Sequence, residues 1–269
     1  MMILGTEDAR LRARIDSVHP LLGVRAGSAL LRIGDQLLAV QDDAWCVAWI
    51  TLPGLAITLD VLKGDGAPLP KKDKPDFEAA FRMPDGGVYL LGSGSKKNRR
   101  TLAHIEPGSK KVTLRKVPEL YGGIQQVLGL HERPNIEAAV LEGDRLRLFH
   151  RGAGTAPSAS VELPLAALEG GRLQVLALQW FELGELDGVA LHITDAATAD
   201  PGRTLFLATA ERTNDAIADG PVAGSAVGLI ETYPHRTSVR WTRLVERDGQ
   251  PSQRKIEGQA VDAEGCGAW

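Results

Sequence analysis

The chain has 269 residues, of which 43% are hydrophobic and 24% charged, and its formal net charge is −3. This balance argues against the broad basic surface of proteins that bind nucleic acids or anionic membranes, so we expect neither as a partner. Residues 1–20 contain no continuous apolar segment of the kind found in secretory signals. The two cysteines, Cys46 and Cys266, fit no metal-binding or redox spacing. These features favour a protein of the reducing cytoplasm.

Short apolar segments separated by turns begin near the N-terminus. Residues 11–18 alternate between polar and apolar, which predicts an edge strand. Two apolar runs follow at 27–31 and 36–40, separated by Gly34 and Asp35, and this pattern is typical of a β-hairpin. The first run carries Ser28 at a position where later copies of the pattern carry an acid.

Two later segments repeat this pattern closely. Residues 74–80 read Lys-Pro-Asp-Phe-Glu-Ala-Ala, and residues 133–139 read Arg-Pro-Asn-Ile-Glu-Ala-Ala. Each is followed by a turn, Asp85-Gly86 or Gly143-Asp144, and then by a second apolar run. Because Asp and Gly tolerate the positive φ of tight turns, both segments are predicted to be equivalent hairpins.

Weaker copies begin with Leu-Asp-Gly-Val-Ala at 186–190 and Arg-Lys-Ile-Glu-Gly at 254–258. Aligned on the acidic position, the copies recur every roughly 50 to 70 residues, close to the length of a four-stranded propeller blade. Apolar runs at 100–105 and 112–117 supply further strands, and 163–168 is the only short helix expected. We therefore predict an all-β protein, a single β-propeller domain over 1–269 with five or six blades. Its last blade is closed by terminal strands or lacks them. A pair of β-sandwiches and a two-domain all-β protein are the alternatives, but neither requires the repeat.

Four of the five aligned positions are acidic: Glu78, Glu137, Asp187 and Glu257. The innermost strands of a propeller line its central channel, so we expect these carboxylates to converge at one mouth. Carboxylates in one narrow space repel each other unless a cation relieves them, and oxygen-rich clusters suit Ca²⁺, Mg²⁺ or Mn²⁺. The pattern predicts a metal site with calcium or another divalent cation as its cofactor.

The alternative is a ring of ion pairs with a purely structural role. Basic residues lie a few positions before the aligned ones, namely Arg25, Lys74, Arg133, Arg254 and Lys255. Carboxylates paired with these bases would join neighbouring blades and hold no metal.

Residues 92–100, Gly-Ser-Gly-Ser-Lys-Lys-Asn-Arg-Arg, combine small residues with four cations. Hydroxyl, amide and guanidinium groups of this kind recognise phosphate, although the glycine spacing matches no nucleotide-binding motif. The predicted substrate-binding residues are Ser93, Ser95, Lys96, Lys97, Arg99 and Arg100. A solvated hairpin loop is the competing interpretation. His150-Arg151 and Glu211-Arg212 occupy corresponding strand ends in other repeats, so this end of the blades is expected to be polar.

A long insertion spans residues 211–231 and includes Asp215 and Asp219. Long ordered loops are often functional, so these two carboxylates are either part of a site or belong to a surface loop.

The repeated opening, an apolar residue, an acid and then Ala or Gly, resembles the β-propellers of esterase-like phytases and related bacterial proteins. The segments that carry the resemblance are 76–80, 135–139, 186–190 and 255–260. The resemblance implies a propeller and, in some members, a calcium-assisted phosphoesterase.

Two functional hypotheses follow. In the first, the four acidic residues hold a divalent cation that polarises a phosphate or other ester and activates water, while the basic segment neutralises the substrate. In the second, the chain is a non-catalytic propeller that binds a small ligand or a partner protein. The sequence does not indicate an oligomeric state.

Overall fold

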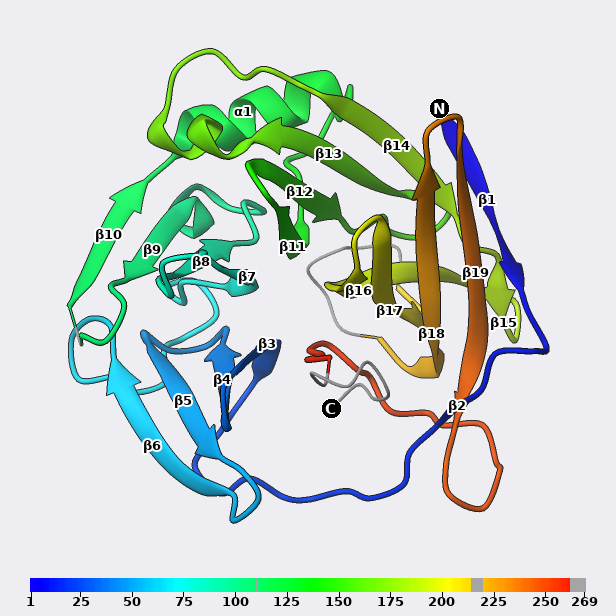
Figure 1. Cartoon of the computed structure of the whole chain (residues 1–269), viewed down its shortest axis with the longest axis horizontal. Helices are drawn as coiled ribbons and strands as arrows, with labels where there is room; N and C mark the ends of the chain where they lie inside the picture. Colours follow the sequence, from blue (N-terminus) through cyan, green and yellow to red (C-terminus); the bar gives the residue numbers. More distant parts are fainter. Residues whose placement is uncertain (110, 214–219, 262–269) are drawn as a thin grey trace.

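The computed structural model describes residues 1–109, 111–213 and 220–261. Its strands form four antiparallel four-stranded units, numbered here 1 to 4 in chain order, which surround one centre (Figure 1). Unit 1 contains β3 (Gly27–Ile33), β4 (Gln36–Gln41), β5 (Cys46–Thr51) and β6 (Ala56–Val61). Unit 2 contains β7 (Phe77–Arg82), β8 (Val88–Gly92), β9 (Thr101–Ile105) and β10 (Val112–Lys116). Unit 3 contains β11 (Ile136–Glu142), β12 (Arg145–His150), β13 (Ser158–Pro164) and β14 (Ala177–Glu182). Unit 4 contains β16 (Val189–Asp200), β17 (Arg203–Glu211), β18 (Val222–Tyr233) and β19 (Arg236–Val245).

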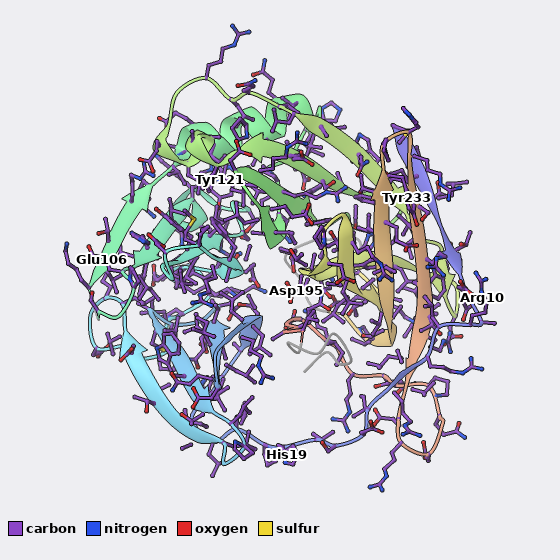
Figure 2. The ribbon with its side chains drawn as sticks, in the orientation of Figure 1. Arg10, His19, Glu106, Tyr121, Asp195 and Tyr233 are labelled. Carbon is purple, nitrogen blue, oxygen red and sulfur yellow. The ribbon has the colours of Figure 1, made fainter. Side chains whose placement is uncertain are left out.

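In every unit the first strand lies nearest the centre and the last strand lies at the periphery (Figure 1). Labelled side chains show the same arrangement: Asp195 lies near the centre, and Arg10, Glu106 and Tyr233 lie towards the rim (Figure 2). The described part of the chain is therefore mostly β and propeller-like, as the sequence predicted. It contains four four-stranded units, so the predicted count of five or six blades is not confirmed.

The hydrophobic core is divided among the spaces between neighbouring units. One cluster joins units 1 and 2 around Phe77 and Leu90, a second joins units 2 and 3, and a third joins units 3 and 4 around Phe149 and Phe206. A fourth cluster covers the remaining face of unit 1 with Ala260 and apolar residues from 21–24. Units 1, 2 and 3 each contribute to two of these clusters and unit 4 to one, so burial of apolar side chains between the units stabilises the ring.

The N-terminal strand β1 (Met2–Glu7) joins units 3 and 4 at their outer edges. It pairs in parallel with β14 through residues 2–4 and with β19 through residues 5–7. The predicted edge strand at 11–18 is reduced to β2 (Ala13–Arg14), which pairs with β19. The short strand β15 (Glu185–Leu186) pairs with β16.

Helix α1 (Pro118–Val127) was not anticipated from the sequence. Its buried face consists of Leu120, Tyr121 and Ile124, but two consecutive glycines interrupt the apolar pattern. The helix expected at 163–168 proves to be the end of β13 followed by a 3₁₀ turn at Leu165–Glu169. No helix among the described residues is long and apolar enough to cross a membrane.

The two predicted hairpin turns are confirmed. Gly86 and Gly143 have φ values of 93° and 62°, and they lie between β7 and β8 and between β11 and β12. The Asp85 carboxylate accepts a hydrogen bond from the backbone N–H of Gly87 at 2.9 Å. The repeat therefore identified two inner hairpins in the correct register.

The junction made by β1 can be tested with two neighbouring side chains. Ile3 is 7% exposed in the core between units 3 and 4, whereas Leu4 is 65% exposed. Ile3→Ala should lower the free energy of unfolding by about 2–5 kcal/mol because it opens a cavity. Leu4→Ala should change it by less than about 0.5 kcal/mol. Urea unfolding of both variants checks this, and equal effects would contradict the placement of β1.

Candidate functional site

Each innermost strand contains a β-bulge, at the second residue in β3, β7 and β11 and midway along β16. The inserted residues are Ser28 in β3, Glu78 in β7, Glu137 in β11 and Thr194 in β16. A bulge interrupts the alternation of side chains and redirects one of them. Ser28, Glu78 and Glu137 line a common central cavity, so the bulge is the local device that turns these side chains towards the axis.

The fourth aligned position was assigned wrongly from the sequence. Asp187 lies in the tight turn between β15 and β16 with a φ of 51°, and its side chain is 57% exposed. Its carboxylate pairs at the surface with Arg243 at 3.0 Å. The structural equivalent is Thr194, seven positions later, whose hydroxyl donates a hydrogen bond to the Ile256 carbonyl at 2.8 Å. An Asp-Gly turn produced the same local sequence pattern as the bulge, and this misled the alignment.

Glu257 reaches the cavity without belonging to a named strand. Its segment lies between units 4 and 1, where the Gln259 N–H donates to Asp195 at 2.6 Å and the Gln259 side chain donates to the Leu205 carbonyl at 3.0 Å. Ala260 packs against unit 1. The last repeat was therefore placed correctly at the centre, but it does not open an innermost strand.

The central cavity has a volume of about 200 Å³ and is strongly polar. Besides Ala26, Ser28 and Asn135, it is lined by five acidic and five basic residues: Asp42, Asp76, Glu78, Glu137 and Glu257, with Lys71, Lys74, Arg99, Arg151 and Lys255. The structure thus brings together three of the four predicted metal ligands, Glu78, Glu137 and Glu257, and leaves out Asp187.

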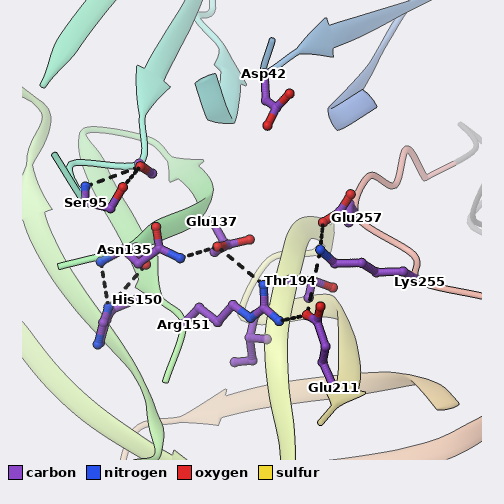
Figure 3. A network of polar contacts seen from close by, with 12 residues as sticks. Asp42, Ser95, Asn135, Glu137, His150, Arg151, Thr194, Glu211, Lys255 and Glu257 are labelled. Atoms are coloured by element: carbon purple, nitrogen blue, oxygen red, sulfur yellow. Dashed lines mark hydrogen bonds and ion pairs between the residues drawn. The ribbon is translucent and has the colours of Figure 1, made fainter. Parts of the chain in front are cut away.

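On one side, the charges form a continuous chain of contacts (Figure 3). Arg151 donates to Glu211 at 2.5 Å and lies 3.8 Å from Glu137. Lys255 lies 3.7 Å from Glu211 and 2.7 Å from Glu257. These pairs match the structural ring considered from the sequence, with Lys255 as one of its expected bases.

The Glu137 carboxylate also has a hydrogen-bond donor from its own unit. The Asn135 amide donates to its carboxylate at 2.5 Å, and the Asn135 backbone N–H donates to Nδ1 of His150 at 3.0 Å. Burial lowers the pKa of His150 to about 4, so the ring is neutral at pH 7 and able to accept this bond. Burial raises the pKa of Glu137 to about 7, although Arg151 opposes the shift.

On the other side, Lys74 bridges the carboxylates of Asp42 and Asp76, lying 2.8 Å from Asp76. Although burial disfavours its charge, hydrogen bonds to both carboxylates raise the pKa of Lys74. Arg99 donates to Asp76 at 2.8 Å and to the Ser95 hydroxyl at 3.0 Å. Both carboxylates are therefore already neutralised by cations of the chain.

Glu78 is the exception. Its carboxylate makes no hydrogen bond or ion pair within the described residues, and it lies within 4.8 Å of carboxylate oxygens of Asp42 and Asp76. Burial, followed by the charges of Glu137, Asp76, Asp42 and Glu257, raises the pKa of Glu78 well above its ordinary value. The cavity therefore presents one acidic group that no cation of the described chain neutralises.

Part of the predicted substrate-binding segment, residues 92–100, makes buried structural contacts instead of facing the solvent. Ser93 and Arg99 are buried against Asp76, and Ser95 bonds to both Ser93 and Arg99. A Cβ on Gly94 would lie 2.2 Å from the Tyr121 ring, so this glycine permits close packing on α1.

Of these residues, Arg99 alone lines the cavity. Lys97 is exposed, Lys96 and Arg100 are half-buried, and Asp215 and Asp219 of the long insertion lie outside the described residues.

The sequence analysis missed Asp42, Asp76 and Glu211 as members of the site. A signal was present, because Asp42 and Arg151 directly follow the second strand of their units and Glu211 ends that strand in unit 4. The polar strand ends noted at His150-Arg151 and Glu211-Arg212 therefore marked the same ring.

Comparison with protein families identifies the chain. Residues 23–268 match a family of unknown function, DUF6929, and the chain belongs to that family. A comparison with curated proteins gives no match.

Solved structures show related folds at low sequence identity. Hydrazine synthase of Kuenenia stuttgartiensis has a TM-score of 0.51 and 12% identity over 93% of this chain and 75% of that chain. YCF48 bound to D1 peptide has a TM-score of 0.36 and 13% identity, covering 83% of this chain and 55% of that chain. A mitotic checkpoint complex chain has a TM-score of 0.42 and 7% identity, covering 93% and 89%. The match to hydrazine synthase, with a TM-score above 0.5, supports the propeller-like fold class, and the phytase type stays a prediction.

Glu137 provides a test of the electrostatics of the site. Its folded-state pKa of about 7 lies above the ordinary 4.5, so the stability contributed by the neutral carboxyl is complete below pH 4.5 and is lost as the pH rises through 7. Glu137→Gln is neutral throughout. Between pH 5 and 8 its free energy of unfolding should therefore fall less, or rise more, than that of the wild type, by up to about 3 kcal/mol.

Urea unfolding at the two pH values measures the difference, with exposed Glu119→Gln as the control. Buried His150 and His192 are common to all three proteins, so their contributions cancel in the comparison. Parallel pH dependence of wild type and Glu137→Gln would show that Glu137 is ionised throughout.

Proposed function

We propose that residues 1–269 form one propeller domain whose central cavity binds a small molecule carrying a protonated amine. The observation that carries this proposal is the unpartnered carboxylate of Glu78 in a cavity where the other carboxylates have partners. The Glu78 side chain is half-buried and lines the cavity without a donor from the described residues, and an ammonium group would supply both a donor and a charge there.

The balance of charges favours a cation over an anion. Lys74, Arg99, Arg151 and Lys255 are each paired with a carboxylate, so an anionic ligand would have to break an existing ion pair. Glu78 is the cavity carboxylate to which the described residues supply no cation, so a protonated amine of the ligand would find its partner there.

The size of the cavity limits the ligand. Its volume of about 200 Å³ is below the roughly 300–1,000 Å³ of pockets that hold drug-sized molecules. The ligand is therefore small, with hydroxyl or amide groups as further donors to the surrounding carboxylates. Lining by ion-paired side chains gives a rigid and highly polar wall.

A divalent cation is the second candidate. Oxygens of Asp42, Asp76 and Glu78 lie within 4.8 Å of one another, a donor set suited to Ca²⁺, Mg²⁺ or Mn²⁺. A metal there would supply the Lewis acid that an ester hydrolase needs. The Lys74 ammonium already bridges Asp42 and Asp76, however, so metal binding requires Lys74 to move. The amine needs no such displacement.

Isothermal titration with methylamine, ethylenediamine, Ca²⁺ and Mn²⁺ separates the two candidates. The amine proposal predicts heat of binding from at least one amine, and at least about tenfold weaker binding to Glu78→Gln, because a hydrogen bond to a charged group contributes about 1.5–3 kcal/mol. Asp187→Asn, which removes a surface carboxylate, should bind as the wild type does.

If Ca²⁺ or Mn²⁺ binds, no amine binds, and the metal binding is lost in Glu78→Gln, the cavity is a metal site and the amine proposal is wrong. Equal binding of amines to wild type and Glu78→Gln would refute the proposed site.

A further inference from the structure

A second cavity lies further along the same innermost strands. Its volume is about 170 Å³, and β3, β7, β11 and β16 all contribute to its walls, so it lies where the four units meet. In β3, β7 and β11 its lining begins one or two positions after Ser28, Glu78 and Glu137, which line the central cavity. The two cavities therefore follow each other along the centre of the ring, and they share no lining residue. Asp195, which is labelled near the centre in Figure 2, belongs to the second cavity.

The second cavity is apolar, unlike the central one. Among the described residues, all but three of those that line it are alanine, leucine, phenylalanine or valine. The alanines at 29, 80, 139 and 196 are buried, and Leu30, Leu31 and Leu141 are half-buried. An apolar cavity of roughly 150 Å³ can hold a molecule the size of benzene. The second cavity is therefore suited to a short hydrocarbon group.

The three polar lining residues, Arg82, Asp195 and Thr198, differ in what they offer a ligand. The Asp195 carboxylate already accepts hydrogen bonds from the backbone N–H groups of Ala196 at 2.8 Å and Gln259 at 2.6 Å. Burial raises the pKa of Asp195 well above its ordinary value, which favours its neutral form. Arg82 and Thr198 are exposed, and within the described ranges their side chains make no hydrogen bond or ion pair. The charge that this cavity offers to a ligand is therefore the positive charge of Arg82.

The strand edges supply further donors. β3, β7 and β11 each lie at the end of a sheet and nearest the centre of the ring, so one edge of each is not paired with another described strand (Figure 1). A free strand edge presents backbone N–H and C=O groups, and such N–H groups donate to carboxylates. The walls of the cavity thus combine apolar side chains with donors for an anion.

We propose that the second cavity binds a small apolar carboxylate, with its oxygens at Arg82 and its hydrocarbon group among the buried alanines. The guanidinium presents a fork of donors that matches the two oxygens of a carboxylate. Because Arg82 is exposed and the alanines are buried, the charge lies at the open side of the cavity and the apolar part lies inside. Removal of the hydrocarbon group from water stabilises the complex. The inference does not depend on the amine proposal, because the two cavities share no lining residue.

Chemical-shift titration of the full chain by NMR tests this site with sodium acetate, butyrate and pentanoate and with neutral pentanamide. Pentanoate should bind most tightly of the three carboxylates, and each added methylene should strengthen binding by about fourfold. Pentanamide should bind at least about tenfold more weakly than pentanoate, because it lacks the charge that pairs with Arg82.

Two variants test the two halves of the site. Arg82→Gln, at an exposed position that is expected to fold, should weaken pentanoate binding at least about tenfold. Ala197→Leu adds volume at a half-buried lining residue and should reduce the gain from each methylene. Arg172→Gln, at an exposed arginine that does not line the cavity, is the matched control and should bind as the wild type does.

Glu78→Gln should keep its affinity for pentanoate, which separates this site from the amine site. Equal binding of pentanoate by Arg82→Gln and the control would overturn the proposal. Binding of pentanamide as tight as that of pentanoate, or no binding of any carboxylate, would overturn it as well.

Discussion

The organisation of this protein depends on how it neutralises carboxylates buried near its axis. Moving an isolated carboxylate out of water is costly, so buried acids are paired or protonated. Here Arg99, Lys74, Arg151 and Lys255 pair with the carboxylates that converge on the centre. Lys74 connects Asp42 after β4 of unit 1 with Asp76 before β7 of unit 2. Arg151 connects unit 3 with Glu211 of unit 4, and Lys255 ties the segment around residue 257 to Glu211. Among the carboxylates that line the cavity, Glu78 is the one to which the described residues supply no such pair.

This centre exists because of features of the strands around it. In β3, β7 and β11 a bulge at the second residue turns Ser28, Glu78 or Glu137 to the central cavity, and a buried alanine follows each of them. Apolar clusters between the units then hold the ring together, and β1 joins the outer edges of units 3 and 4. The ring therefore accounts for Glu137 of the second Glu-Ala-Ala segment, which is paired within it, whereas Glu78 of the first segment has no such partner among the described residues.

The sequence predicted the parts that depend on local patterns. Both Glu-Ala-Ala segments and their glycine turns identified inner hairpins, because a buried strand followed by a positive-φ turn has a distinctive composition. Asp187 was misassigned because an Asp-Gly turn has the same local pattern as the bulge, and only strand pairing distinguishes them. Asp76 joined the site through Arg99 of its own unit, 23 positions away in the chain, and Glu211 through Arg151 of unit 3, 60 positions away. The polar strand ends marked Arg151 and Glu211, but only the folded structure shows which residues pair.

The central claim is that Glu78 faces the cavity without a neutralising partner. Carbon-13 NMR titration of glutamate side-chain carboxyls, with Glu78→Gln used to assign the resonance, measures its ionisation directly. The account predicts that in the ligand-free protein Glu78 titrates well above its ordinary pKa of 4.5, as burial and four neighbouring carboxylates require. A binding amine should then lower that pKa. Titration of Glu78 near 4.5 in the ligand-free protein would show that a cation already neutralises it and would contradict the account.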